Sequence, residues 1–282
     1  MVDPGPRPPP LRPLREIIAE HQIGARKGLG QHFLLDLNLT RRIARAAGAL
    51  DSVSVIEIGP GPGGLTRALL EGGARHVSAI ERDARCVAAL QELVQAYPGR
   101  LTIIEGDALT LDPATLTAPP RKIVANLPYN VATPLLIGWL RKINEYESLT
   151  LMFQKEVALR LGAAPRTRDY GRLSVVTQYL ATVKPLFDIP ASAFVPPPNV
   201  TSTVVQIVPR TVPLGACAMA DLEQVTAAAF GQRRKMLRSS LRTLGVDSEA
   251  LLAAAGIAPT RRAEELAVEE FCALAGAYSG RS

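Results

Sequence analysis

Short apolar runs and amphipathic segments alternate along the first half of the chain. The runs are rich in Val and Ile and end at Gly, Glu or Asp, which is typical of buried parallel strands. They predict strands at residues 53–58, 76–80, 101–104, 123–125 and 149–153. The segments between them have apolar residues at helical spacing and predict helices at 38–48, 65–70, 87–94 and 135–140. This alternation predicts an α/β fold with a doubly wound, mostly parallel sheet.

The pattern changes near Gly171. A helix is predicted at 174–180, and two extended stretches at 183–189 and 203–208 flank the proline cluster FVPPPNV. We interpret these stretches as an antiparallel extension that brings the sheet to seven strands. A linker at 209–215 precedes an alanine-rich, helical end. The predicted organisation is a proline-rich leader with an N-terminal helix (1–25), an α/β domain (26–210) and a small all-α C-terminal domain (216–282).

Composition limits the possible functions of this chain of 282 residues. Apolar residues make up 47% of it, enough for a substantial core, but no uninterrupted apolar run approaches the roughly 18 residues of a transmembrane helix. Three cysteines and three histidines, all far apart, predict no disulfide framework, metal site or Ser/His/Asp triad, and they favour a cytoplasmic location. The net charge of +6 mildly favours a polyanionic partner.

A glycine-rich loop, EIGPGPG at 57–63, directly follows the first predicted strand. Glycines let a backbone turn tightly and approach a ligand closely. The spacing also satisfies the GxGxxG pattern of nicotinamide enzymes, so the loop alone does not decide between cofactors. Two prolines in the loop remove amide donors that a pyrophosphate would need, and Glu57 places a negative charge there. A cationic nucleoside without phosphate, such as S-adenosylmethionine, fits these residues better.

Two carboxylates follow the next predicted strands. Glu81 is placed to accept hydrogen bonds from two ribose hydroxyls, a role that serves NAD equally well. Asp107 is placed to accept from an exocyclic amine of adenine, although an Asp at a strand end is often a helix N-cap. Ligands of doubly wound sheets bind outside the carboxyl ends of the strands, where all these residues are expected.

The motif ANLPYN at 125–130 ends the fourth predicted strand, next to the expected cofactor site. Asn126 and the Leu127 carbonyl offer two acceptors for the hydrogens of an adenine N6 amine. Pro128 stiffens the turn, and Tyr129 offers a flat ring on which a base can stack. An isolated motif of this kind is also compatible with an ordinary strand-to-helix turn, so its position beside the cofactor site decides the interpretation.

The chain resembles the bacterial 16S ribosomal RNA adenine N6-dimethyltransferases of the rRNA adenine dimethylase superfamily, from about residue 27 to 244. The shared motifs are KGLGQHFL (27–34), IEIGPGPGGLT (56–66), ERD (81–83), EGDAL (105–109), ANLPYN, FQKEVALRL (153–161), YGRLSVVTQY (170–179), AFVPPPNVTSTVV (193–205) and FGQRRKMLRSSL (230–241). The resemblance implies a Rossmann-like methyltransferase fold and N6,N6-dimethylation of two adjacent adenosines in the 3′-terminal hairpin of 16S rRNA, within a precursor of the 30S subunit.

The resemblance also implies cofactor contacts at His32, Leu34, Gly59, Glu81, Asp107 and Asn126, and it implies Phe194 as a second aromatic wall for the target adenine. The predicted cofactor site further includes Glu57, Gly61 and Ala108. The acceptor base is assigned to the motif residues Asn126, Leu127, Pro128 and Tyr129. His32 stands where asparagine is commoner in the family, and Ser239 likewise replaces a frequent asparagine. No metal is expected.

A basic C-terminal helix is predicted to bind RNA phosphates. Its basic residues are Arg233, Arg234, Lys235, Arg238 and Arg242, and apolar residues from Phe230 to Leu244 give it a second face. A charged helix face is by default merely solvated, but this one accompanies a predicted nucleobase pocket. Arg26, Lys27, Arg166 and Arg168 would extend the basic surface. We expect a monomer with no membrane association.

Three alternatives remain at this point. A resistance-type methyltransferase of 23S rRNA would usually carry NIPY in place of NLPY. A non-catalytic RNA-binding assembly factor on the same fold is disfavoured by the intact glycine loop. A dehydrogenase that uses NAD is disfavoured by the loop prolines and by the lack of a histidine in the second half of the chain.

Overall fold

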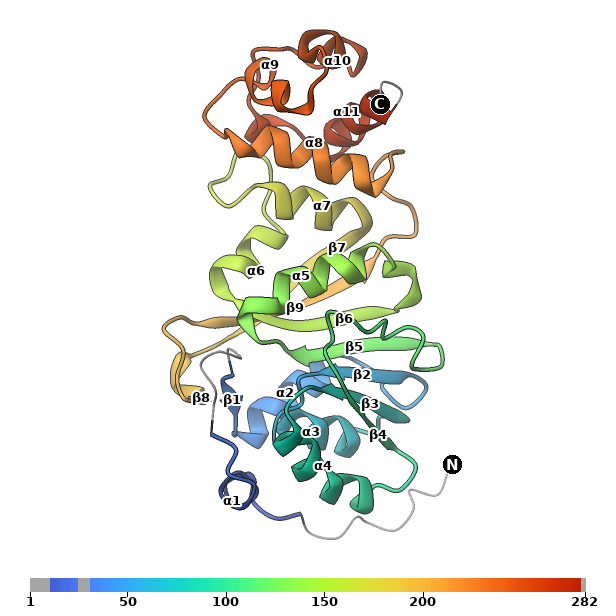
Figure 1. Ribbon diagram of the computed structural model, residues 1–282, viewed down its shortest axis with the longest axis vertical. Coiled ribbons are helices and arrows are strands. Elements are labelled where there is room, and N and C mark those ends of the chain that lie inside the picture. Colours follow the sequence, from blue (N-terminus) through green and yellow to red (C-terminus); the bar gives the residue numbers. More distant parts are fainter. Residues whose placement is uncertain (1–10, 25–30, 280–282) are drawn as a thin grey trace. The chain divides into compact units, whose positions relative to one another are not determined.

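The computed structural model describes residues 11–24 and 31–279. Its main sheet (Figure 1) contains seven strands: β2 (Ser54–Ile58), β3 (His76–Glu81), β4 (Leu101–Glu105), β5 (Arg121–Asn126), β6 (Ser148–Gln154), β7 (Ala181–Ile189) and β9 (Ser202–Pro209). The strand order is β4-β3-β2-β5-β6-β9-β7. Two further short strands, β1 (Phe33–Leu34) and β8 (Phe194–Val195), form a separate antiparallel pair.

The pairing of the strands confirms the predicted fold class. β2, β3, β4, β5 and β6 are parallel to one another, and β9 runs antiparallel to β6. All residues of β2 and nearly all of β3 are buried, as expected of strands covered on both faces. Because β2 to β5 are parallel, their carboxyl ends meet at one edge of the sheet.

Helices connect the strands. The helices are α1 (Leu14–Glu20), α2 (Leu37–Ala46), α3 (Gly64–Glu71), α4 (Ala84–Ala96), α5 (Tyr129–Leu140), α6 (Lys155–Leu161), α7 (Arg172–Leu180), α8 (Met219–Gly231), α9 (Leu237–Ser240), α10 (Ser248–Ala254) and α11 (Val268–Ser279), with 3-10 turns η2 (Ile143–Glu145), η3 (Ala191–Ala193), η4 (Leu241–Leu244) and η5 (Ala263–Glu265). Aspartates cap several of them: Asp36 accepts from Asn38 N at α2, and Asp83 accepts from Arg85 N at α4. Within the described ranges, no helix has the length and hydrophobicity that a bilayer crossing needs.

The chain forms two compact units. The first takes in the chain through Lys155 together with Leu186–Ile207, and the second takes in Glu156–Pro185 together with the chain from Val208 onward. The core of the first unit packs α2 and α3 against the sheet, around residues such as Val55, Leu69 and Val77. The core of the second unit is helical, and α8 and α11 pack together in it.

These units do not follow a single linear boundary at 209–215. α6 and α7 belong to the second unit because Tyr170, Val175 and Tyr179 are buried in its helical core. The hydroxyl of Tyr170 also donates to the Leu266 carbonyl over 2.8 Å. The linker at 209–215 can be recognised from a few adjacent residues. The packing of α6 and α7 cannot, because it joins residues that are about 50 to 100 positions apart.

The prediction of a single basic helix that carries Arg233 to Arg242 is wrong. α8 stops at Gly231, residues 232–236 form a turn, and α9 and η4 follow. The turn is held by tertiary contacts: Met236 forms a β-bridge with Arg262, and Leu237 N donates to the Arg261 carbonyl over 2.8 Å. These contacts override the helical pattern of the segment, and Gly231 is the one helix-ending signal in the sequence.

Candidate active site

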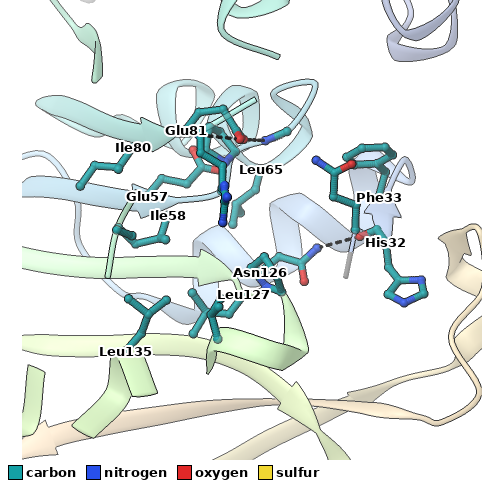
Figure 2. A pocket seen from close by; sticks show the side chains of 18 of the residues that line it. His32, Phe33, Glu57, Ile58, Leu65, Ile80, Glu81, Asn126, Leu127 and Leu135 are labelled. Atoms are coloured by element: carbon teal, nitrogen blue, oxygen red, sulfur yellow. Dashed lines mark hydrogen bonds between the residues drawn. The ribbon is translucent and has the colours of Figure 1, made fainter. Parts of the chain in front are cut away.

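A large cavity of about 1160 Å³, its open mouth included, lies at the carboxyl ends of β2 to β5. Twelve of the predicted site residues line it: His32, Leu34, Glu57, Gly59, Gly61, Glu81, Asp107, Ala108, Asn126, Leu127, Pro128 and Tyr129. Figure 2 shows Glu57 and Glu81 on neighbouring strands, with Asn126 and Leu127 at the end of a third. Residues that lie about 100 positions apart therefore share one space.

The glycine loop that follows β2 forms one wall. Gly61 and Gly63 have φ of +56° and +89°, in the left-handed region that favours glycine. A Cβ on Gly61 would lie 3.0 Å from the ring of Phe33, and one on Gly63 would lie 2.8 Å from a methyl group of Leu93. The loop therefore needs these glycines both for its turn and for its close packing.

Backbone amides fix the carboxylate of Glu81. Gly61 N donates to Oε2 over 3.0 Å, and the amides of Arg82 and Asp83 each donate to Oε1 over 2.9 Å. Burial still raises the pKa of Glu81 above its ordinary value, with the three amides opposing the shift. The Glu81–Gly61 bond ties β3 to the glycine loop (Figure 2).

Glu57 is a buried carboxyl group with an unsatisfied oxygen. Its side chain is 1% exposed, and Oε2 has no hydrogen-bond partner among the described residues. Burial raises the pKa of Glu57 to about 8, the nearby Thr66 hydroxyl lowers it in part, and the charge of Glu81 raises it further. Because an uncompensated buried carboxylate is costly, this wall of the cavity is suited to a cationic ligand.

Asp107 stands at the turn after β4. Its Oδ1 accepts from Leu109 N over 3.0 Å, and its Oδ2 lies 3.4 Å from Nη1 of Arg82. Asp107 therefore holds the backbone of Ala108 and Leu109 at the cavity edge while part of its carboxylate remains exposed. Asp107 can therefore cap the turn, as an Asp at a strand end often does, and still face a ligand.

Asn126 ends β5 at the cavity. Its Nδ2 donates to the His32 carbonyl over 3.4 Å (Figure 2), an orientation assigned from this hydrogen bond. The amide oxygen is thereby left to accept from a ligand. Pro128 directly precedes α5, which begins at Tyr129, so the helix predicted at 135–140 starts six residues earlier. Proline next to the first helical turn fits the preset φ that the helix requires.

Tyr129 is held by Ser202, which the sequence did not single out, and by the predicted site residue His32. Its hydroxyl lies 2.6 Å from Ser202 Oγ, and its ring centroid lies 5.6 Å from that of His32. His32 Nδ1 in turn lies 2.8 Å from the Pro196 carbonyl. The sequence signal for these contacts was the motif AFVPPPNVTS itself. The pairing of β1 with β8 brings its first part next to His32, and the pairing of β9 with β6 places Ser202.

Phe194 does not line the cavity. Its side chain is 2% exposed and packs in the core of the first unit. The role of Phe194 as a second wall for a base therefore stays a prediction. Other lining residues, such as Ile80 and Leu109, were not selected from the sequence, although each adjoins a predicted ligand position.

The predicted RNA-binding residues lie in the second unit. Arg234, Lys235 and Arg238 are exposed, and no ion pair within the described residues engages them. Arg233 differs, since its Nε donates to Glu264 over 2.9 Å and its Nη2 donates to the Thr167 carbonyl over 3.2 Å. That carbonyl belongs to the loop of Arg166 and Arg168, so these two basic segments are neighbours. Arg26 and Lys27 lie outside the described residues.

No cluster of His, Cys, Asp and Glu suited to a metal ion occurs in the described ranges 11–24 and 31–279. The groups that line the cavity include carboxylates, side-chain amides, backbone groups and aromatic rings.

Comparisons with known proteins agree with this arrangement. The chain is 63% identical over 272 residues to the ribosomal RNA small subunit methyltransferase A of Paramagnetospirillum magneticum, covering 96% of each protein, and 64% identical over 267 residues to that of Rhodospirillum rubrum, covering 95% and 92%. The solved 23S rRNA methyltransferase ErmE is 28% identical with a TM-score of 0.63 over 88% of this chain and 99% of that one.

A dimethyladenosine transferase from Plasmodium falciparum shares the fold, with a TM-score of 0.71 at 23% identity over 86% of this chain and 96% of that one. The sequence profile of the ribosomal RNA adenine dimethylases matches residues 23–279, nearly the whole chain. The resemblance found in the sequence motifs is thus confirmed, and the chain belongs to the ribosomal RNA adenine dimethylase family.

Proposed function

We propose that the protein transfers methyl groups from S-adenosylmethionine to N6 of two adjacent adenosines in the 3′-terminal hairpin of 16S rRNA. The observation that carries this proposal is the geometry of Asn126: its amide nitrogen is engaged by His32, which leaves its oxygen as an acceptor at the cavity. The similarity to small subunit methyltransferases over 96% of the chain supports the choice of 16S rRNA.

The cavity fits S-adenosylmethionine on three counts. The unsatisfied Glu57 carboxyl suits the ammonium group of a cationic ligand. Glu81, held by amides, presents fixed acceptors to ribose hydroxyls. Asp107 and Ala108 border the place where an adenine would lie, and His32, Leu34, Gly59 and Gly61 complete the walls. When bound, S-adenosylmethionine supplies an electrophilic methyl group on a sulfonium sulfur.

The acceptor adenine would be held by the ANLPYN turn. The Asn126 oxygen and the Leu127 carbonyl accept the two N6 hydrogens, which makes the nitrogen more tetrahedral and directs its lone pair. The Tyr129 ring stacks on the base, a contact worth about 1–3 kcal/mol. Positioning of the amine in line with the methyl group supplies most of the rate acceleration. After methyl transfer, the methylated amine loses its proton to water. A second round at the same nitrogen requires Asn126 to accept the single remaining hydrogen.

The basic residues of the second unit, Arg234, Lys235 and Arg238, would contact RNA phosphates. Such contacts supply affinity without choosing a sequence. The target base must leave its stack to reach Tyr129, which is easier in a hairpin loop than inside a helix. We further propose that the protein acts in the cytoplasm as a monomer during assembly of the small subunit.

The test is transfer of label from S-adenosylmethionine to unmethylated 30S subunits and to 23S rRNA, followed by mapping of the modified base. We expect two dimethylated adenosines in the 16S hairpin. Label in 23S rRNA alone would favour the 23S alternative, to which the likeness to ErmE points. Binding of 30S subunits without transfer would favour a non-catalytic assembly factor.

A further inference from the structure

The hydroxyl of Tyr129 is engaged in a hydrogen bond with another residue of the protein and is not free to bind a ligand in the cavity. It lies 2.6 Å from Ser202 Oγ, and Ser202 is fully buried and does not line the cavity. The two residues are 73 positions apart, so the bond is a tertiary contact. What Tyr129 can offer a ligand is therefore its ring face, whose direction depends on where the hydroxyl is held.

Ser202 is a fixed anchor. It is the first residue of β9 and pairs with Gln154 of β6 in antiparallel register. The residue before it is also tied down, since Lys155 N donates to the Thr201 carbonyl over 2.9 Å. The serine hydroxyl thus stands on backbone that belongs to the main sheet, whereas Tyr129 opens the first turn of α5.

A second contact supports the Tyr129 ring. The His32 ring lies 5.6 Å away, centroid to centroid, at an angle of 32°. His32 is itself fixed, because a carbonyl oxygen can only accept, so Nδ1 must carry the proton that it donates to the Pro196 carbonyl at 2.8 Å. The segment from Pro196 to Ser202 therefore supports Tyr129 at two points, one direct and one through His32.

We propose that Ser202 is a positioning residue for the acceptor base: its hydrogen bond holds the Tyr129 ring in the orientation onto which the target adenine stacks. This inference rests on the proposed function. A tyrosine without the bond would rotate among several orientations and would lose that freedom when the base binds. Holding it beforehand removes this entropic cost from RNA binding. Ser202 acts through Tyr129 and has no contact of its own with the base.

The experiment is a double-mutant cycle with Ser202→Ala, Tyr129→Phe and both together, assayed on unmethylated 30S subunits. We expect each single change to raise the KM for 30S subunits about three- to tenfold, because each removes the same hydrogen bond while the aromatic ring itself is kept but no longer held in one orientation. The double variant should be no worse than either single one. Binding of S-adenosylmethionine should stay at the wild-type affinity in all three.

Thr203 provides a matched control on the same strand. Its hydroxyl donates to Asp188 Oδ1 over 2.6 Å, away from Tyr129. Thr203→Ala should lower the melting temperature without raising the KM, whereas Ser202→Thr, which keeps the hydroxyl, should restore a near-normal KM.

A spectroscopic readout on the protein alone is the NMR signal of ¹³Cζ-labelled tyrosine, in which the Tyr129 resonance should shift and broaden in Ser202→Ala.

Three outcomes would overturn the inference. Ser202→Ala with a lower melting temperature but an unchanged KM would make the bond merely structural. Effects of Ser202→Ala and Tyr129→Phe that multiply in the double variant would show that the two hydroxyls act independently. An unchanged Tyr129 resonance in Ser202→Ala would show that the ring is held by other contacts. Failure of the wild-type protein to methylate 30S subunits would refute the proposed function instead.

Discussion

Asn126 and His32 are joined across the cavity mouth by a hydrogen bond of 3.4 Å from the Asn126 side-chain nitrogen to the His32 carbonyl oxygen. The bond ties the end of β5 to the residue before β1. It also decides which end of the amide faces a ligand, because the nitrogen is already engaged. The structure uses the nitrogen of Asn126 in this bond, and the proposed function uses its oxygen.

The first prediction concerns Asn126→Ala. Loss of the acceptor should lower kcat by about 100-fold or more, the scale seen when one positioned hydrogen-bonding group is removed from a transition state. The affinity for S-adenosylmethionine should fall by less than about tenfold, since Glu57 and Glu81 remain. Single-turnover methylation and calorimetric titration measure the two quantities. A kcat near that of the wild type would refute the positioning role of the amide.

The second prediction concerns the pH dependence of stability. Because the pKa of Glu57 is raised to about 8 in the folded state, the unfolded chain loses its proton first as the pH rises. The free energy of unfolding should therefore fall by roughly 5 kcal/mol from this group between about pH 4.5 and 8, and level off above pH 8. Urea unfolding of the ligand-free protein at several pH values measures this.

Glu57→Gln is the matched control for the pH experiment. It removes the titrating proton and keeps the shape of the side chain, so the fall in stability over this pH window should largely disappear. Calorimetry with S-adenosylmethionine in buffers of different ionisation enthalpy should also show a released proton near neutral pH in the wild type. A proton count of zero would mean that Glu57 does not ionise when the cation binds.

The third prediction concerns Glu81→Gln. A glutamine side chain has a single oxygen and cannot accept from three backbone amides and two hydroxyls, so at least one of the hydrogen bonds that Glu81 receives from the glycine loop and from the turn after β3 is lost. The Kd for S-adenosylmethionine should rise about 10- to 100-fold, the range for hydrogen bonds to a charged group. An unchanged Kd would place the ribose elsewhere in the cavity.

The fourth prediction separates RNA binding from folding within the basic segment. Arg234→Ala combined with Arg238→Ala should weaken binding of 16S rRNA and reduce the slope of log K against log salt by about 1.5 to 2, because two phosphate contacts are lost. Arg233→Ala should instead lower the melting temperature, since Arg233 pairs with Glu264 and the Thr167 carbonyl. Equal salt slopes in the double variant and the wild type would assign these arginines to solvated surface.

Much of the site could be predicted because its residues sit at strand ends, where a short local pattern fixes their place. Glu81 and Asp107 each follow a β-branched run, and parallel strands necessarily bring their ends together. The anchoring residues could not be found in this way. Ser202 lies at the start of a strand and meets Tyr129 only because β9 is inserted beside β6, which no local pattern indicates.

The errors in the fold have the same origin. The segment from Gln232 to Met236 has a helical composition, but a bridge to Arg262 and the ion pair of Arg233 hold it as a turn. Tertiary contacts of this kind outweigh intrinsic helix propensity, which amounts to a few tenths of a kcal/mol per residue.

The second unit is assembled from two separate stretches of chain, and this limits how the protein can change. A truncation after Ile207 would leave α6 and α7 behind with Tyr170, Val175 and Tyr179 stripped of their partners, so the remainder would expose apolar surface and aggregate. A replacement for the helical part must therefore supply both stretches, because the C-terminal helices complete their core only with α6 and α7, which lie between strands of the main sheet.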